Sequence, residues 1–133
     1  MSYEESLRSV SLDADASLGI YTGVPGLPGS ADPNTGKQYC FVKVTGAHQV
    51  GLCTAATDVI AGILQNKPQN VGMAATIGFA GISNVIAGAA VNAGDKVAPD
   101  GSGRAVTDAT NGRCVALAST TTVGAVIPVL IRY

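Results

Sequence analysis

Residues 91–106 read VNAGDKVAPDGSGRAV, and this stretch decides the class of fold. Within it, Asp-Gly-Ser-Gly at residues 100–103 separates two short runs, 96–99 and 104–106, that both contain apolar side chains. Because glycine adopts positive φ without steric cost, such a connection is typical of a β-hairpin loop. Asn-Ala-Gly-Asp at residues 92–95 is a second turn signal directly upstream. Turns this closely spaced leave no room for a helix of ordinary length, so the stretch predicts short strands.

The rest of the chain also indicates an all-β fold. Residues 38–45, QYCFVKVT, are β-branched and aromatic, and they form the clearest predicted strand. Further strands are expected at residues 50–54, 59–65, 73–79, 83–86, 113–118 and 125–132. Pro128 lies inside the last of these, and because proline cannot donate to a ladder it predicts an edge strand or a bulge. We therefore expect a small barrel or sandwich of short antiparallel strands.

The two halves of the chain resemble each other weakly. VTGAHQVG from Val44 is similar to VNAGDKVA from Val91, roughly fifty residues later. Two similar β units folded onto one another would close most exposed strand edges. Alternatively, the likeness reflects chance, because Val, Gly and Ala dominate both halves.

The first part of the chain differs in character from the rest. Residues 1–20 are too polar to form a core of their own and predict an extended arm. Residues 22–36, TGVPGLPGSADPNTG, contain three prolines and predict a loop. We therefore divide the chain into an N-terminal arm with a Pro/Gly-rich loop, residues 1–37, and a β-rich body, residues 38–133. The large apolar residues early in the arm are Tyr3, Leu7, Val10 and Leu12.

The composition favours a protein that contacts other proteins. The 133 residues suit one domain, and charged residues make up only 13% of them, about half the usual share. A surface with so few charges is typical of one that other protein covers. A net charge of −1 argues against nucleic-acid binding, which needs clustered Lys and Arg. Residues 71–94 lack charge, but glycines interrupt them, so two buried strands joined by a turn at Ala80-Gly81 are expected in place of a membrane span. The polar N-terminus predicts no signal peptide.

Candidate catalytic groups are few. Cys40, Cys53 and Cys114 are an odd number without metal-binding spacing, which favours reduced, buried thiols in a protein made in a cytosol. His48 is the only histidine, so a Cys–His pair would depend on it, yet its TGAHQ setting predicts a solvated turn. The sequence GSADPNTGK, from Gly29, departs from a phosphate loop in spacing, in its missing hydroxyl residue and in the strand that follows. We predict no catalytic residue, no cofactor and no metal.

Three segments carry a resemblance to a known family. They are AGILQNKP at residues 61–68, the hairpin stretch at 91–106 and CVALA at 114–118. In their order and spacing, residues 58–133 resemble phage head-decoration (capsid cement) proteins, which have a small β-barrel or β-tulip-like body. The N-terminal forty residues lie outside this resemblance.

The resemblance implies a structural virion protein with no reaction to catalyse. Such proteins bind the outer surface of a bacteriophage capsid, commonly as trimers, and stabilise it. The implied partners are the major capsid protein and further copies of this chain in a homotrimer, with neither nucleic acid nor membrane involved. The implied location is the outer capsid surface of the virion, after synthesis in the host cytoplasm. We expect the arm to contribute capsid or intersubunit contacts through Tyr3, Leu7, Val10 and Leu12.

Two other functions remain open at this point. The first is another virion component, a head-fibre base or a tail accessory protein, which would share the β body. The second is a small cysteine-dependent enzyme that uses His48.

Overall fold

The computed structural model describes residues 7–18, 37–68 and 71–131, which fold as β-strands with one short 3₁₀ helix. The all-β class expected from the sequence is confirmed. The elements in chain order are β1 (Arg8–Ala14), η1 (Ala16–Leu18), β2 (Phe41–Gly46), β3 (Gln49–Leu52), β4 (Ile60–Leu64), β5 (Ala74–Ile86), β6 (Lys96–Pro99), β7 (Ala105–Thr107), β8 (Cys114–Ala116) and β9 (Val126–Ile131).

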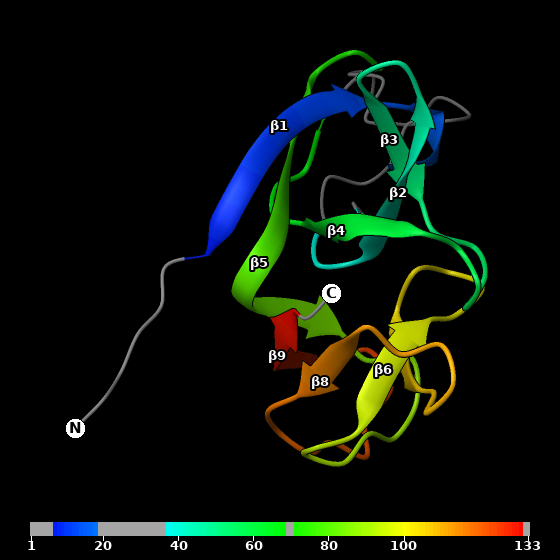
Figure 1. Cartoon of the computed structure of the whole chain (residues 1–133), viewed down its shortest axis with the longest axis vertical. Coiled ribbons are helices and arrows are strands. Elements are labelled where there is room, and N and C mark those ends of the chain that lie inside the picture. Colours follow the sequence, from blue (N-terminus) through cyan, green and yellow to red (C-terminus); the bar gives the residue numbers. More distant parts are fainter. Residues whose placement is uncertain (1–6, 19–36, 69–70, 132–133) are drawn as a thin grey trace, which may run out of the picture.

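The first five strands close into a barrel. Their order is β1–β3–β2–β4–β5, and β5 pairs back with β1, so that the ring is complete. The pairing of β1 with β3 is parallel, and the other four pairings are antiparallel. Closure of the ring gives every strand two neighbours and leaves no free edge in the barrel. This barrel forms the upper part of the molecule in Figure 1.

The remaining strands form a second sheet that also includes β5. The order of this sheet is β5–β9–β8–β6–β7. An isolated parallel bridge between Ala87 and Ala105 connects the end of β5 to β7, so these five strands nearly close a second ring. In Figure 1, β5 runs from the barrel into this lower ring.

Strand β5 is a single element of 13 residues, whereas the sequence predicted two strands separated by a turn at Ala80-Gly81. That prediction was wrong because Gly81, at φ 102°, bends the strand without ending it. Strand β1 pairs with β5 as far as Ala80, and β9 takes over from Gly81. One strand therefore serves both rings, with a different partner on each side of the bend.

The predicted hairpin at residues 96–106 is confirmed. Strands β6 and β7 pair antiparallel with Pro99 opposite Ala105. The Asp100 carboxylate accepts hydrogen bonds from the amides of Ser102, at 2.8 Å, and Arg104, at 2.9 Å, and Gly103 has φ 73°. The aspartate and the glycine thus hold the turn, as the sequence indicated.

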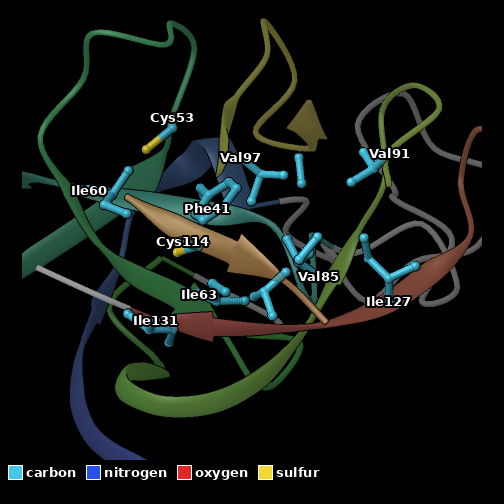
Figure 2. Close-up of a cluster of buried hydrophobic side chains, with 13 residues drawn as sticks. Phe41, Cys53, Ile60, Ile63, Val85, Val91, Val97, Cys114, Ile127 and Ile131 are labelled. Atoms are coloured by element: carbon cyan, nitrogen blue, oxygen red, sulfur yellow. The ribbon is translucent and has the colours of Figure 1, made fainter. Parts of the chain in front are cut away.

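The buried side chains form two clusters on either side of a shared wall. Successive side chains of a strand point to opposite faces. On β2, Phe41 points into the second ring and Val42 into the barrel; on β4, Ile63 and Leu64 divide in the same way. All four side chains are fully buried. Figure 2 shows Phe41 and Ile63 meeting Val85, Val97 and Cys114 from the second ring. The two rings are therefore one packed unit.

Pro128 lies in a strand with a neighbour on each side, which corrects the prediction of an edge strand or a bulge. Strand β9 pairs with β5 along its whole length, with Asn84 opposite Pro128. On the other side the carbonyl of Pro128 accepts a hydrogen bond from the amide of Leu117 at 2.9 Å, one residue beyond the end of β8. The missing proline N–H faces the point where β8 has ended, so no bond within the β8–β9 ladder is lost.

Residues 7–18 of the expected arm pack as part of the barrel. Strand β1 pairs with β5 over six residue positions, and Ala14 and Leu18 are fully buried inside the barrel. The rest of the expected arm and loop, residues 1–6 and 19–36, lies outside the described residues. The division of the chain into an arm with a loop, residues 1–37, and a body, residues 38–133, stays a prediction.

The weak likeness between the two halves does not correspond to equivalent structure. Residues 46–49 join two adjacent antiparallel strands, β2 and β3. Residues 92–95 instead connect Val91, which forms an isolated bridge with Thr120, to strand β6. The alternative that the likeness reflects chance is the better interpretation.

Candidate interaction surface

The structure separates His48 from the cysteines near it in the sequence. His48 lies exposed in the turn between β2 and β3, at φ 53°, and its carbonyl accepts a hydrogen bond from the amide of Asp13 at 2.7 Å. Cys40 precedes β2 and Cys53 follows β3, so both lie at the opposite end of this hairpin. The nearer of the two in sequence, Cys53, is five residues of strand from His48, and about 3.3 Å for each residue makes this separation about 16 Å. Cys114 belongs to β8 in the second ring. The described residues therefore hold no Cys–His pair of the kind that an enzyme would need.

All three cysteines are reduced thiols and buried, as the sequence indicated. Burial raises the pKa of the Cys53 thiol from 9.0 to about 12, and it raises the pKa of Cys40 as well. Buried thiols that keep their proton behave as small apolar core residues.

This burial predicts how the protein responds to thiol reagents and to alkaline pH. At neutral pH, a chromogenic disulfide reagent should leave the native protein unlabelled and should label three thiols once denaturant is added.

Between about pH 9 and pH 12 the unfolded chain loses the Cys53 proton while the folded chain keeps it. Stability should therefore fall as pH rises, by up to about 1.4 kcal/mol per pH unit from this group. Urea unfolding across this range measures the slope, and Cys53→Ala should reduce it; an unchanged slope would contradict the assignment.

The described residues include no group of three or more His, Cys, Asp or Glu side chains that could hold a metal ion. No helix within these residues has the length and apolar character needed to cross a membrane.

The four predicted contact residues lie in different environments. Leu7 is half-buried and packs against the core cluster of the second ring, and Leu12 is half-buried against the barrel cluster. Val10 is 44% exposed on β1, and Tyr3 lies outside the described residues. Much of the surface of Leu7 and Leu12 is therefore buried within the molecule. Val10 is the most exposed of the three described residues, on the same face of β1 as the buried Ala14.

The second ring carries an apolar surface that the sequence analysis did not identify. On β9, Ile127, Val129 and Ile131 are buried, so the alternate side chains point outward. Strands β5 and β8 follow the same alternation. Seven outward residues on these three strands and the residue after β8 are apolar, and we call them the outer apolar face: Ile82, Ile86, Val115, Leu117, Val126, Pro128 and Leu130.

The pairing register makes this surface continuous. Leu130 lies opposite Ile82 on one side and Val115 on the other, so these three form a row across the sheet. Side chains directly opposite one another in neighbouring strands are in contact range. Ile82, Leu117 and Val126 are 43%, 44% and 51% exposed, and the other four are half-buried. The face is a connected patch, which is more informative than isolated exposed apolar residues.

The face differs from the barrel surface in its charge. The polar residue that lies among the seven is the neutral Asn84, opposite Pro128, and Lys96 lies at the margin, opposite Val115. The barrel surface instead carries an ion pair of 3.0 Å between Lys43 and Asp58. The backbone amide of Thr54 and the Lys43 ammonium hold the pKa of Asp58 below its ordinary value, so this carboxylate stays charged.

A pocket of about 250 Å³ adjoins one end of the outer apolar face at Ile86. Lys37 and Arg104 bring two cations to its wall, but the Arg104 Nε lies 3.4 Å from the Asp100 carboxylate, which offsets one of the charges. The remaining lining residues are Cys40 and Ser102. The pocket therefore marks a polar border of the face.

Comparison with known proteins supports the fold. No protein-family model matches the chain, and no curated protein matches it either. Among solved structures, the chain is similar to the crystal structure of the head fiber gp8.5 N base in bacteriophage phi29, with a TM-score of 0.62 and 15% sequence identity. The match covers 95% of this chain and 94% of that chain. The two proteins therefore share a fold over almost their whole lengths.

Proposed function

We propose that this chain is a structural protein of a bacteriophage particle, and that it binds the outer surface of the capsid and stabilises it without catalysing a reaction. The observation that carries this proposal is the fold shared with a phage head-fiber base along nearly the full length of both chains. The low charge of the chain and its outer apolar face are consistent with a protein whose surface is covered by other proteins.

Two versions of this role have separate support. The sequence resemblance at residues 58–133 favours a decoration or cement protein spread over the capsid. The solved structure with the similar fold is a head-fiber base, which favours a chain that anchors a projecting fibre. Both versions place the chain on the capsid exterior, with the major capsid protein as its partner.

Multivalency would supply the binding strength in either version. Three copies joined in a ring present three equal contacts to the shell, and such an arrangement raises avidity by about 10²–10⁴ over a single contact.

Strand β1 already has β3 and β5 as neighbours, so we expect its contacts with a partner to use side chains such as Val10 and not strand addition.

Electron cryo-microscopy of particles with and without this chain tests the proposal. We expect density of the two-ring fold on the outer capsid surface, absent when the chain is deleted, and genome release at a lower temperature from the deleted particles. An extended projection rising from that density would identify a fibre base, and a bare two-ring body would identify a cement protein. Density confined to the tail, or particles unchanged by the deletion, would contradict the proposal.

The contribution of β1 is measured in the same particles by occupancy. Val10→Asp should lower shell occupancy, whereas Ser9→Asp, at the neighbouring exposed position on the other face of the strand, should leave it unchanged. Equal occupancy for both variants would remove Val10 from the contact.

A further inference from the structure

We propose that the outer apolar face of β5, β9 and β8 is the surface through which copies of this chain associate with one another. This inference deepens the proposed function, on which its role in a particle depends, but it is tested on the purified protein alone. It assigns the self-contact to a sheet face, whereas the sequence placed intersubunit contacts in the N-terminal arm.

The first argument is the cost of leaving this face in water. Three of its side chains, Ile82, Leu117 and Val126, are more than two-fifths exposed, and their half-buried neighbours connect them into one patch. Apolar area that stays hydrated forgoes about 25 cal/mol for each Å² that could be buried. Connected patches of this kind in soluble proteins mark contact sites with other molecules.

The second argument concerns which partner fits. In a symmetric assembly each copy contributes the same surface elements, so a charged residue near the axis would meet its own counterpart. The central rows of the face, Ile82–Leu130–Val115 and Ile86–Val126, contain no ionisable group that would be apposed in this way. The exposed Asn84 side chain offers both a donor and an acceptor, so two copies can satisfy one another.

The barrel surface of the same chain is a poorer match for this face. Burying the face against the Lys43–Asp58 pair would desolvate two charges without offering them any new partner. A neutral, apolar surface is best covered by another neutral, apolar surface, and a second copy of this chain supplies one of the same size and shape.

The third argument comes from the sheet itself. Strand β9 is paired with β5 and β8, and β8 is paired with β9 and β6, so their backbone groups are used within the chain. A partner therefore meets side chains and not open strand edges. Around a threefold axis, the same face of three copies can meet in this way, side chain against side chain.

Sedimentation of the purified chain over a range of concentrations tests this assignment. We expect the native protein to associate reversibly. Ile82→Lys and Val126→Lys, at two well-exposed positions on different strands, should each weaken association at least tenfold, because each places a charge in the contact. Val59→Lys is the matched control: Val59 is 88% exposed but lies in the loop before β4, and its replacement should leave association unchanged. Circular dichroism of all variants should show native strand content and confirm that they fold.

The possible outcomes separate this inference from the proposed function. A native protein that stays monomeric at its highest soluble concentration overturns the inference, as does association that neither lysine variant weakens. Binding to phage shells by a monomeric chain would overturn it while leaving the proposed function intact. Association that is lost in both lysine variants, by a chain that does not bind shells, would support the self-contact and refute the proposed function.

Discussion

Phe41→Ala is expected to lower the free energy of unfolding by about 3–5 kcal/mol, the range for removing a large buried aromatic side chain. Phe41 is fully buried and is the largest such side chain among the described residues. It projects from the wall strand β2 into the cluster of the second ring, and its backbone is bonded on both sides. Its amide donates to the carbonyl of Gly103 at 2.7 Å, and its carbonyl accepts from the amide of Cys53 at 3.0 Å. Because the surrounding backbone is fixed in this way, little collapse into the cavity is expected.

Urea denaturation followed by circular dichroism measures this loss. Because the cluster around Phe41 joins both rings, we expect one cooperative transition in the native protein and in the variant. Val59→Ala, at a position 88% exposed, is the control and should change stability by no more than about 0.5 kcal/mol. A loss below about 1 kcal/mol for Phe41→Ala, or two separate transitions in the native protein, would contradict the description of a shared wall.

The local parts of the fold could be predicted because the responsible residues are adjacent in the sequence. The β6–β7 hairpin depends on Asp100 and Gly103, which lie between the strands that they connect. The strand at β2 was predictable from its β-branched and aromatic residues, and its consecutive buried residues, Phe41 and Val42, agree with a strand covered on both faces.

Other features depend on residues far apart in the sequence. Gly81 was interpreted as a turn, but a glycine in an apolar run is typical of a turn and of a bend within one strand. The pairing of β5 with β1 up to Ala80 and with β9 from Gly81 shows that it is a bend. Pro128 was assigned to an edge or a bulge because its missing N–H would break a ladder in a central strand. The sequence does not show that the neighbouring strand β8 ends before it reaches Pro128. The polar sequence of β1 gave no sign that the barrel closes through it, since the closure depends on pairing with β3 and β5.

The candidate surface was missed for a related reason. Residues 126–131, VIPVLI, are apolar on both faces of the strand, so no alternation indicates which side is exposed. The low charge of the chain did indicate that some surface would be covered by protein. Only the burial of Ile127, Val129 and Ile131 shows that the other side chains form that surface.

Gly62→Ala is expected to cost about 3 kcal/mol or more, at the upper end of what inserted atoms cost in a packed interior. Gly62 lies in β4 opposite Val42, next to the place where β4 pairs with β5 through Ile63 and Leu64. A Cβ atom at this position would overlap the carbonyl oxygen of Gly78 and would lie 2.7 Å from the Cγ2 of Ile77. The first obstacle is backbone of the strand that both rings share, so it cannot move aside as a flexible side chain would. The variant must either separate β4 from β5 or displace the wall between the two clusters.

Gly101→Ala provides the matched control, because the nearest atom to a Cβ there is the carbonyl oxygen of Thr54, at 4.0 Å. Its stability should differ from that of the native protein by no more than about 0.5 kcal/mol. If Gly62→Ala accumulates only as aggregate, hydrogen exchange on the small refolded fraction, measured beside Gly101→Ala, still reports the effect. Loss of protection at the Gln65 amide, which donates to the carbonyl of Thr76 in β5 at 2.8 Å, would agree with a forced separation of these strands. Full protection and an unchanged unfolding midpoint would show that β4 does not approach β5 as closely as described, and the closure of the barrel would then have to be revised.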